Sequence, residues 1–433
     1  MWLTIVFFVL IALMIFINVK TGVNLGLMAF GAGLLIAAIV SGTTANAALI
    51  AGFPLRNFLN MFFATMFFGF ANQTGAMKGI AQRLMYTFRN KAALLPYVGF
   101  VTSFIISAAG GGVAVTPFIM SPMMFSLAMQ LGFHPVLASF ATWMCAWGAQ
   151  AVPWQFMWQY NISMYVGIFG EENIDAITNG WIKFNVWGII TALIVFTAIY
   201  FITGAHKITA KSVIIEKPEP FTREQSITVK VLATAIAIMV IPPVLNTIFP
   251  GVAVFDWIST YIGLQVVCIL GTIVLCFLKI APLKDVLSNQ IPWNLLVTLT
   301  GMVFYISMAN SMGVVDTLIG PIQSLSIPVK WIVIILAMAY AVLCYFADGS
   351  SIEPMLFPLY AVFVTMGATI PLVIATFSLA AMSVSISPYS GGGGSSLTGC
   401  PDSMMDKCMR TQMLLPIANI VLLFIFSIIG VLN

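Results

Sequence analysis

Four short segments of small and polar residues interrupt long apolar stretches of this chain. Two segments lie in the first half of the chain: 107–117 (Ser-Ala-Ala-Gly-Gly-Gly-Val-Ala-Val-Thr-Pro) and 147–154 (Trp-Gly-Ala-Gln-Ala-Val-Pro-Trp). The other two lie in the second half: 347–354 (Ala-Asp-Gly-Ser-Ser-Ile-Glu-Pro) and 385–396 (Ser-Ile-Ser-Pro-Tyr-Ser-Gly-Gly-Gly-Gly-Ser-Ser). Glycine and proline at such places release backbone N–H and C=O groups, and each unsatisfied group costs several kcal/mol in lipid. Released N–H groups at a helix N-terminus suit an anion, and released C=O groups suit Na⁺ or another hard cation. The four segments therefore predict a binding site.

The segments are paired by their spacing. Pro117 precedes Pro153 by 36 residues, and Pro354 precedes Pro388 by 34 residues. Glycine and proline are common in membrane helices, where they permit kinks and close packing, so a single pair would favour packing. Two pairs of breaks at matching offsets favour a binding site instead.

Candidate site residues are the glycines and the hydroxyl, amide and acidic side chains of these segments. The candidates for contact with a substrate are Gly110, Gly111, Gly112, Thr116, Gln150, Ser350, Ser351, Ser387, Pro388, Ser390, Gly392 and Gly393. The candidates for cation coupling, with Na⁺ as the candidate ion, are Ser107, Ala109, Gly148, Asp348, Gly349, Glu353, Ser385 and Gly391. Because no Lys or Arg lies in any break, an anion would be held by helix N-termini, amides, hydroxyls and a co-bound cation.

Asp348 and Glu353 are the only acidic residues of the four segments. A carboxylate at membrane depth is costly, about 2.5–3.5 kcal/mol for Asp on insertion scales, so such residues are functional candidates. Asp348 could ligate a cation or carry a coupling proton. The alternative is that Asp348 caps the returning helix near the outer surface and that Glu353 complements the dipole of its first turn.

The composition places these breaks inside a membrane. Of the 433 residues, 61% are hydrophobic and 7% are charged, whereas about 25% are charged in a usual soluble domain. We therefore expect an all-α polytopic membrane protein. Ten crossings, each near or above the roughly 20 residues that span the hydrocarbon core, are expected at about 2–18, 24–40, 55–74, 135–165, 181–203, 229–249, 257–278, 291–311, 370–400 and 411–432.

Two further apolar stretches, at about 93–130 and 329–366, turn in the middle and are expected to be re-entrant hairpins with the small polar residues at their tips. The crossings at about 135–165 and 370–400 are over-long and interrupted, which predicts two discontinuous helices. The polar segment 205–225 is expected to be a linker between a first repeat, 1–204, and a second repeat, 226–433. Since each repeat has five crossings, the second runs in the opposite sense. Inverted repeats with broken helices are typical of secondary transporters.

The basic residues orient the chain in the membrane. With the N-terminus outside, 14 of the 17 Lys and Arg residues fall on the cytoplasmic side, as the positive-inside rule requires. Counting either hairpin as one crossing would abolish this bias. We therefore expect a multi-pass protein of the cell inner (plasma) membrane, with both termini outside and the linker 205–225 in the cytoplasm.

Three short motifs resemble those of known transporters. The stretches 51–54 (Ala-Gly-Phe-Pro), 68–75 (Phe-Gly-Phe-Ala-Asn-Gln-Thr-Gly) and 387–390 (Ser-Pro-Tyr-Ser) are similar to segments of the ion transporter superfamily, its divalent anion:Na⁺ symporter class, and most closely the malonate/dicarboxylate carrier branch. The resemblance implies a homodimer of elevator type, in which early helices of each repeat form a fixed scaffold while hairpins and broken helices carry the substrate. The Ser-Asn-Thr signature of the class is absent, since the tips read Ala-Gly-Gly-Gly at 109–112 and Asp-Gly-Ser-Ser at 348–351.

Several functions fit these observations. The first is a transporter of a small organic anion, with dicarboxylates favoured, coupled to Na⁺ or H⁺. A cation antiporter or an anion exporter on the same fold, and the large membrane subunit of a binding-protein-dependent importer, are the alternatives. An enzyme is not expected, because neither a nucleophile with a histidine nor metal-ligand spacing is present. We expect no cofactor and no nucleic-acid partner; the expected partners are the anion, the lipid bilayer and a second copy of the chain.

Position 173 tests the predicted orientation. The acidic loop that contains Asn173 lies outside in the N-out topology. In N173C, made in a background without the six native cysteines, we expect the thiol to react with a membrane-impermeant maleimide added to intact cells. Protection of this thiol until the membrane is opened would contradict the N-out orientation.

Overall fold

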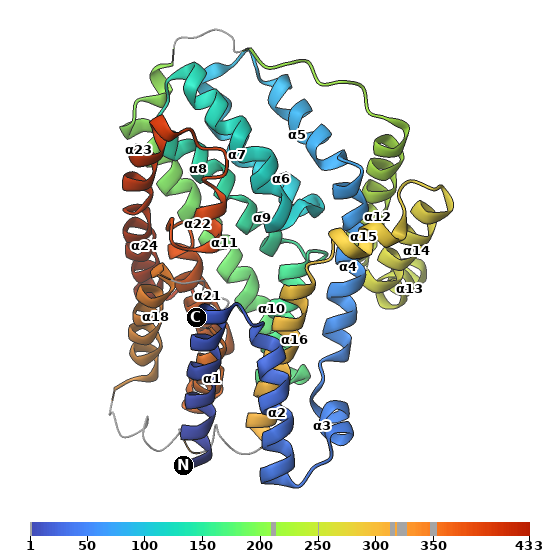
Figure 1. The fold of residues 1–433 in the computed structure, drawn as a ribbon, viewed down its shortest axis with the longest axis vertical. Coiled ribbons are helices and arrows are strands. Elements are labelled where there is room, and N and C mark those ends of the chain that lie inside the picture. Colours follow the sequence, from blue (N-terminus) through green and yellow to red (C-terminus); the bar gives the residue numbers. More distant parts are fainter. Residues whose placement is uncertain (1, 209–213, 250, 312–316, 318–326, 347–352) are drawn as a thin grey trace.

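The described part of the chain is built from helices and turns and contains no strand. The computed structural model describes residues 2–208, 214–249, 251–311, 317, 327–346 and 353–433. In Figure 1, α1, α2 and α3 lie toward one end of the molecule, and α5 and α7 extend to the opposite end. The all-helical architecture agrees with the fold class expected from the composition.

The helices before the linker include one long apolar helix, α11, and a series of shorter ones around the predicted breaks. In chain order they are α1 (Trp2–Thr21), α2 (Leu25–Ser41), α3 (Ala45–Gly52), α4 (Leu55–Gln73), α5 (Ala76–Thr87), η1 (Ala92–Leu94), α6 (Leu95–Ile106), η2 (Ser107–Gly111), α7 (Gly112–Leu131), α8 (Pro135–Trp143), α9 (Cys145–Ala151), α10 (Phe156–Phe169), η3 (Glu171–Asn173), α11 (Ile174–Ile202) and η4 (Ala205–Lys207).

The helices after the linker begin with the long α12 and end with α24. In chain order they are α12 (Arg223–Ile248), α13 (Ala253–Tyr261), α14 (Leu264–Phe277), α15 (Leu283–Asn289), α16 (Trp293–Ser311), α18 (Val329–Phe346), η5 (Glu353–Leu356), α20 (Phe357–Thr365), α21 (Ile370–Val384), α22 (Gly391–Ser395), α23 (Asp402–Gln412) and α24 (Leu415–Ile429).

The first hairpin consists of α6 and α7, which pack against each other, with η2 at the tip. Two glycines allow the chain to turn, because Gly110 has φ 121° and Gly112 has φ 55°. Glycine adopts such positive φ angles without the steric cost that a Cβ atom would bring. The three-glycine run of the sequence therefore marks the point where α6 ends and α7 begins.

The discontinuous helices are interrupted close to the predicted positions. The chain leaves the helical conformation at 152–155, between α9 and α10, and again at 385–390, between α21 and α22. At the second break the Ser390 hydroxyl accepts a hydrogen bond from the N–H of Gly393 at 3.2 Å and so caps α22. The tip of the expected second hairpin, at 347–352, lies outside the described residues.

Membrane crossing by single straight helices is limited in the described part of the chain. The stretches long and apolar enough by themselves are Ala92–Gly111, Glu171–Ile202, Arg223–Asn246 and Asp402–Ile429. Two bent pairs raise the number from 4 to 6: α2 with α3, bent by 115°, and α13 with α14, bent by 81°. The expected crossing at 257–278 is therefore not one straight helix, because the chain is extended at Gly263. The count of ten crossings stays a prediction.

Helices from before and after the linker share one core. α11 packs along α21, and α2 packs along α16. The contact between α2 and α16 is close, since a Cβ atom on Gly26 would lie 2.1 Å from the carbonyl oxygen of Val297. Small residues of this kind let helix backbones approach each other in a membrane, where van der Waals packing drives association.

The linker is attached to the end of α5. The Arg83 guanidinium carbon lies 3.5 Å from the ring centroid of Phe221, and Arg83 also donates a hydrogen bond to the carbonyl of Glu219. Thr222 and Gln225 form a capping box that starts α12. The Gln225 side chain also donates to the carbonyl oxygen of Thr74 at 3.2 Å. These contacts fix the start of α12 relative to α4 and α5.

Gly26 and Gly31, both in α2, test the close contact with α16. We expect G26A to lower the melting temperature of the purified protein in detergent, because the added methyl group meets backbone atoms and such overpacking costs about 1–3 kcal/mol. G31A is the matched control, since a Cβ there meets nothing within 4 Å. Equal melting temperatures of the two variants would contradict the packing of α2 on α16.

Candidate functional site

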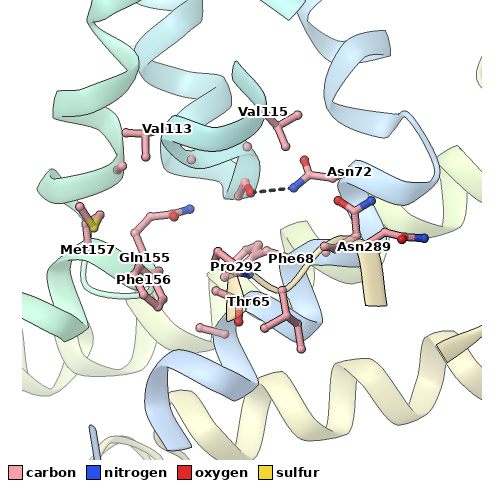
Figure 2. A pocket seen from close by; sticks show the side chains of 18 residues that line it. Thr65, Phe68, Asn72, Val113, Val115, Gln155, Phe156, Met157, Asn289 and Pro292 are labelled. Carbon is pink, nitrogen blue, oxygen red and sulfur yellow. Dashed lines mark hydrogen bonds between the residues drawn. The ribbon is translucent and has the colours of Figure 1, made fainter. Parts of the chain in front are cut away.

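A cavity of about 290 Å³ lies beside the tip of the first hairpin (Figure 2). Its lining comes from α4, from the hairpin tip, from the start of α10 and from the segment 289–292 that joins α15 to α16. Residues from before and after the linker therefore enclose it together. The size suits a small molecule rather than a drug-sized one, whose pockets measure roughly 300–1,000 Å³.

Three helices begin at this cavity. Its lining includes Gly112 of α7, Phe156 of α10, and Pro292, which directly precedes α16. No side chain caps the N-terminus of α7 or of α10. The N–H groups of a first helical turn and the positive end of the helix dipole both favour an anion. The helix starts at this cavity would therefore suit an anion, although the first N–H of α7, that of Gly112, already donates to the carbonyl oxygen of Ser107.

Carboxamide side chains lie on two sides of the cavity. Figure 2 shows Gln155 on one side and Asn72 and Asn289 on the other. The Nδ2 atom of Asn72 donates to the carbonyl oxygen of Gly110 at 3.4 Å, while its Oδ1 atom is buried without a hydrogen-bond partner. All the residues that line the cavity are uncharged. A ligand there would be bound by amides and helix N-termini, as the sequence predicts for an anion.

Neighbouring side chains hold the hairpin tip in place. Trp154 Nε1 and Gln155 Nε2 both donate to the carbonyl oxygen of Ala108, at 2.7 and 3.0 Å. The Ser107 hydroxyl donates to the carbonyl oxygen of Cys145 at 2.6 Å. The carbonyl groups of Ala108 and Cys145 thus have partners within the protein.

The predicted substrate residues of the first half are divided between the cavity and the core. Gly110, Gly111 and Gly112 line the cavity. Thr116 is fully buried in α7, and its hydroxyl oxygen has no hydrogen-bond partner. Gln150 lies away from the cavity lining, since its Nε2 atom donates to the carbonyl oxygen of Ala146 at 3.3 Å and lies 3.2 Å from the Met382 sulfur.

The first-half candidates for cation coupling surround the same tip without lining the cavity. Ser107 makes the hydrogen bond to Cys145 described above, and Ala109 is partly buried against the core. Gly148 permits close packing, because a Cβ atom there would lie 2.3 Å from the carbonyl oxygen of Phe104. In the described part of the chain, Gly148 thus allows α9 to pack closely against α6.

The candidates in the second break lie apart from this cavity. The Ser387 hydroxyl donates to the carbonyl oxygen of Tyr345 at 2.9 Å, which ties the break to the end of α18. Ser385 accepts a hydrogen bond from Trp143 Nε1 at 3.0 Å, which ties it to α8. Pro388 lies in this turn, and Ser390 caps the short helix that contains Gly391, Gly392 and Gly393.

Gln412 of α23 provides further hydrogen bonds to the second break. Its Nε2 atom donates to the carbonyl oxygens of Ile386 and Gly393, at 2.7 and 3.0 Å. Its Oε1 atom is buried without a hydrogen-bond partner. Gln412 thus stabilises the buried part of the four-glycine run, while Gly391 is exposed, and a binding role of this run stays a prediction.

The predicted tip of the second hairpin cannot be placed, because Asp348, Gly349, Ser350 and Ser351 lie outside the described residues. Glu353, which directly follows this stretch in η5, is described. Its Oε1 atom accepts a hydrogen bond from the Tyr165 hydroxyl at 2.9 Å. Glu353 does not line the cavity at the first tip.

Sequence reasoning missed four amides that line the cavity, Asn72, Gln155, Asn289 and Gln290. Asn72 belongs to the motif 68–75, and Gln155 directly follows the break at 147–154, so both had a signal in the sequence. Asn289 and Gln290 come from a short polar turn between two expected crossings. Only the folded chain brings that turn to the first hairpin tip.

Gly110 tests the shape of the hairpin tip. In G110A, the added Cβ would meet Phe68 Cδ1 at 2.5 Å on a backbone with φ 121°. We therefore expect thermal stabilisation of the purified protein by a dicarboxylate to need at least about tenfold more ligand. This corresponds to a loss of about 1.4 kcal/mol or more in binding free energy. G132A is the control, because Gly132 also has a positive φ, +71°, but a Cβ there meets nothing within 4 Å. Equal ligand dependence of the two variants would remove the tip from the site.

Comparison with known proteins extends these observations. Residues 1–152 match the family model described as the N-terminus of the dicarboxylate carrier protein MatC. No curated protein matches the chain. A similar fold is found in the crystal structure of the Alcanivorax borkumensis YdaH transporter, which is described as having an unusual topology. The TM-score is 0.59 and the sequence identity is 15%, and the match covers 92% of this chain and 88% of that chain.

These matches agree with the resemblance that the short motifs indicate. The match to the MatC N-terminus covers both the 51–54 and the 68–75 motifs. The likeness to the YdaH transporter extends over most of the chain and concerns the fold. The resemblance to the malonate/dicarboxylate carrier branch is therefore confirmed for residues 1–152, and the matched family and fold are those of membrane transporters rather than enzymes.

Proposed function

We propose that this chain is a secondary active transporter of a small organic anion, with a dicarboxylate as the favoured substrate. The observation that carries the proposal is the meeting of three helix N-termini and several carboxamides at one cavity without a charged side chain in its lining. Such a site binds an anion through oriented N–H donors. The description of the matched family model, a dicarboxylate carrier, supports the same substrate class.

The distribution of donors supports a substrate with two carboxylates. Gln155 and the start of α10 lie on one side of the cavity, and Asn72 and Asn289 lie on the other (Figure 2). Gln155 and Asn72 each already donate one hydrogen bond to a carbonyl of the hairpin tip, so each could hold a carboxylate group through its second N–H. A monocarboxylate would leave one set of donors without an anionic partner, so we expect it to bind more weakly.

The absence of Lys and Arg from the cavity lining supports coupling to a cation. A dianion that moves through a low-dielectric site without a fixed positive charge carries a large electrostatic cost. Movement together with Na⁺ or H⁺ lowers this cost and lets the gradient of that cation drive accumulation. We propose such symport, with the ion to be identified by the experiment below.

The walls of the cavity support a mechanism of elevator type. The tip of the first hairpin is hydrogen-bonded to the start of α9 and to Trp154 and Gln155, which favours their movement as one body. Residues of α4 and of the segment before α16 form the opposite wall. We propose that this wall belongs to a scaffold that forms a homodimer and that the hairpin tip slides along it.

Uptake into proteoliposomes tests the proposed function. The purified protein is reconstituted, and the uptake of labelled mono-, di- and tricarboxylates is measured with a Na⁺ gradient, with a proton gradient and with neither. We expect dicarboxylate uptake that at least one of the two gradients accelerates. Uptake of no carboxylate under any of these conditions would overturn the proposal.

Asn289, which is exposed at the cavity, tests the electrostatics of the site. In N289D, the added negative charge should weaken the apparent affinity for a dicarboxylate by about tenfold and for a monocarboxylate by less, since the repulsion scales with the charge of the ligand. N90D is the matched control, because Asn90 is exposed and does not line the cavity. Equal losses for both substrates, or none, would contradict an anion at this position.

A further inference from the structure

Glu353 lies in a second polar cluster, separate from the cavity at the first tip. Its Oε1 atom accepts hydrogen bonds from Tyr165 of α10, at 2.9 Å, and from Tyr360 of α20, at 3.5 Å. The Tyr165 hydroxyl is also 2.8 Å from the hydroxyl of Ser378 on α21. Carboxyl, phenol and serine therefore form one chain of hydrogen bonds that joins η5, α10 and α21.

The cluster is shielded by aromatic side chains. Tyr165 and Tyr360 are both 0% exposed, and Ser378 is 6% exposed. The rings of Tyr360 and Phe377 lie 4.7 Å apart, and those of Tyr165 and Tyr360 lie 6.4 Å apart. A carboxyl group against such a wall keeps its charge only at a cost in solvation, so its charge state matters to the packing around it.

The hydroxyl groups allow this series of hydrogen bonds to persist whether the Glu353 carboxyl is ionised or protonated. When Glu353 is ionised, Tyr165 donates to it and accepts from Ser378. When Glu353 is protonated, its own O–H can donate to Tyr165, which then donates to Ser378. Because each hydroxyl is both a donor and an acceptor, one proton can enter from water and leave again without loss of a hydrogen bond. A cation site would instead need several oxygen ligands that point at one position.

Among the described residues, the titratable groups around Glu353 include phenols and a thiol. α10 supplies Tyr165, with Tyr160 beside it, α20 supplies Tyr360, and α18 supplies Tyr340 and Cys344. α21 contributes the Ser378 hydroxyl and has no titratable side chain, and α1, which packs against η5, carries Lys20 in its last turn as its only charged residue. Tyr165 and Tyr360 both donate to the carboxyl of Glu353, so a proton bound there would alter both hydrogen bonds.

α10 connects this cluster to the substrate cavity. Phe156 at the start of α10 lines the cavity, and Tyr165 lies nine residues further along the same helix, a distance of about 14 Å at 1.5 Å per residue. A change in the hydrogen bond between Tyr165 and Glu353 therefore acts on the helix whose N-terminus faces the substrate. The second hairpin and the cavity are linked through this one rigid element.

We propose that Glu353 is the binding site of a coupling proton and that Tyr165 transmits its protonation state to α10. The coupling role of Glu353 rests on the proposed transport function, whereas proton binding by Glu353 does not. The proton comes from the aqueous side that the second hairpin faces, resides on the Glu353 carboxylate while substrate moves, and is released to water on the other side. No covalent bond other than the O–H bond forms or breaks.

The proton site is tested first without substrate. Infrared difference spectra of the purified protein are recorded across a pH titration, and the C=O stretch of a protonated carboxyl is followed. We expect one component of this signal to be absent from E353Q and present in E172Q, the control at an exposed glutamate. Y165F, which keeps the ring, should move the midpoint of that component to higher pH by about one unit, because the ionised form loses a hydrogen bond. Persistence of that component in E353Q, with an unshifted midpoint in Y165F, would overturn the proposal.

Transport measurements then test the coupling role. In proteoliposomes we expect a proton gradient to accelerate substrate uptake by wild type and E172Q. In E353Q we expect the increase in uptake rate caused by the gradient to be at least tenfold smaller. Substrate exchange without a gradient should continue in E353Q. Full acceleration in E353Q would overturn the coupling role. If wild type transports no carboxylate, the proposed function fails, but the infrared titration still decides whether Glu353 binds a proton. If E353Q does not fold, both measurements are made on Y165F. We then expect the pH dependence of the infrared component and of uptake to shift relative to wild type. An unshifted pH dependence would contradict the proposal.

Discussion

A backbone group released at a helix break must find a partner within a membrane, and this requirement accounts for polar contacts at the two breaks described below. At the first hairpin tip, the carbonyl of Ala108 receives two hydrogen bonds, from Trp154 and Gln155. At the second break, the carbonyls of Ile386 and Gly393 share the amide of Gln412. The protein thus satisfies the carbonyl side of its breaks with its own side chains. At the first tip, the N–H of Gly112 donates to the carbonyl oxygen of Ser107, and no side chain caps the start of α10.

The cavity offers both kinds of polar group. The carbonyls of Ala108 and Gly110 already have partners, and Asn72 Oδ1 is an acceptor without one, while the amides and helix starts supply the N–H groups that our proposal assigns to an anion. Because the lining contains no charged residue, we propose that a coupled ion supplies the compensating charge. Glu353, a partly exposed carboxyl that we propose as the proton site of this coupling, lies elsewhere, and α10 connects the two places.

The sequence predicted the breaks well because glycine and proline report local backbone conformation. The run at 110–112 marks the first hairpin tip, and the non-helical turns at 152–155 and 385–390 fall at or beside the predicted breaks. The 81° bend between α13 and α14 was not predicted, because a single glycine at 263 within an apolar stretch does not distinguish a kink from a straight helix.

Side-chain partners could not be predicted in the same way, because they come from segments far apart in the sequence. Asn289 reaches the first tip only through the packing of α15 and α16, and Gln150 points toward Met382 although it lies in a predicted break. Glu353 was recognised by its cost in a membrane, but its partner Tyr165 lies 188 residues away. Sequence patterns thus locate irregular backbone, whereas the tertiary fold decides which break stays open.

Hydrogen–deuterium exchange of the purified protein, with and without a saturating dicarboxylate, tests most directly whether three helix N-termini form the anion site. The account predicts that the ligand slows exchange of amides at the starts of α7, α10 and α16 together, while exchange in 391–395 stays unchanged. Unchanged exchange at all three starts, with protection confined to the second break, would contradict it.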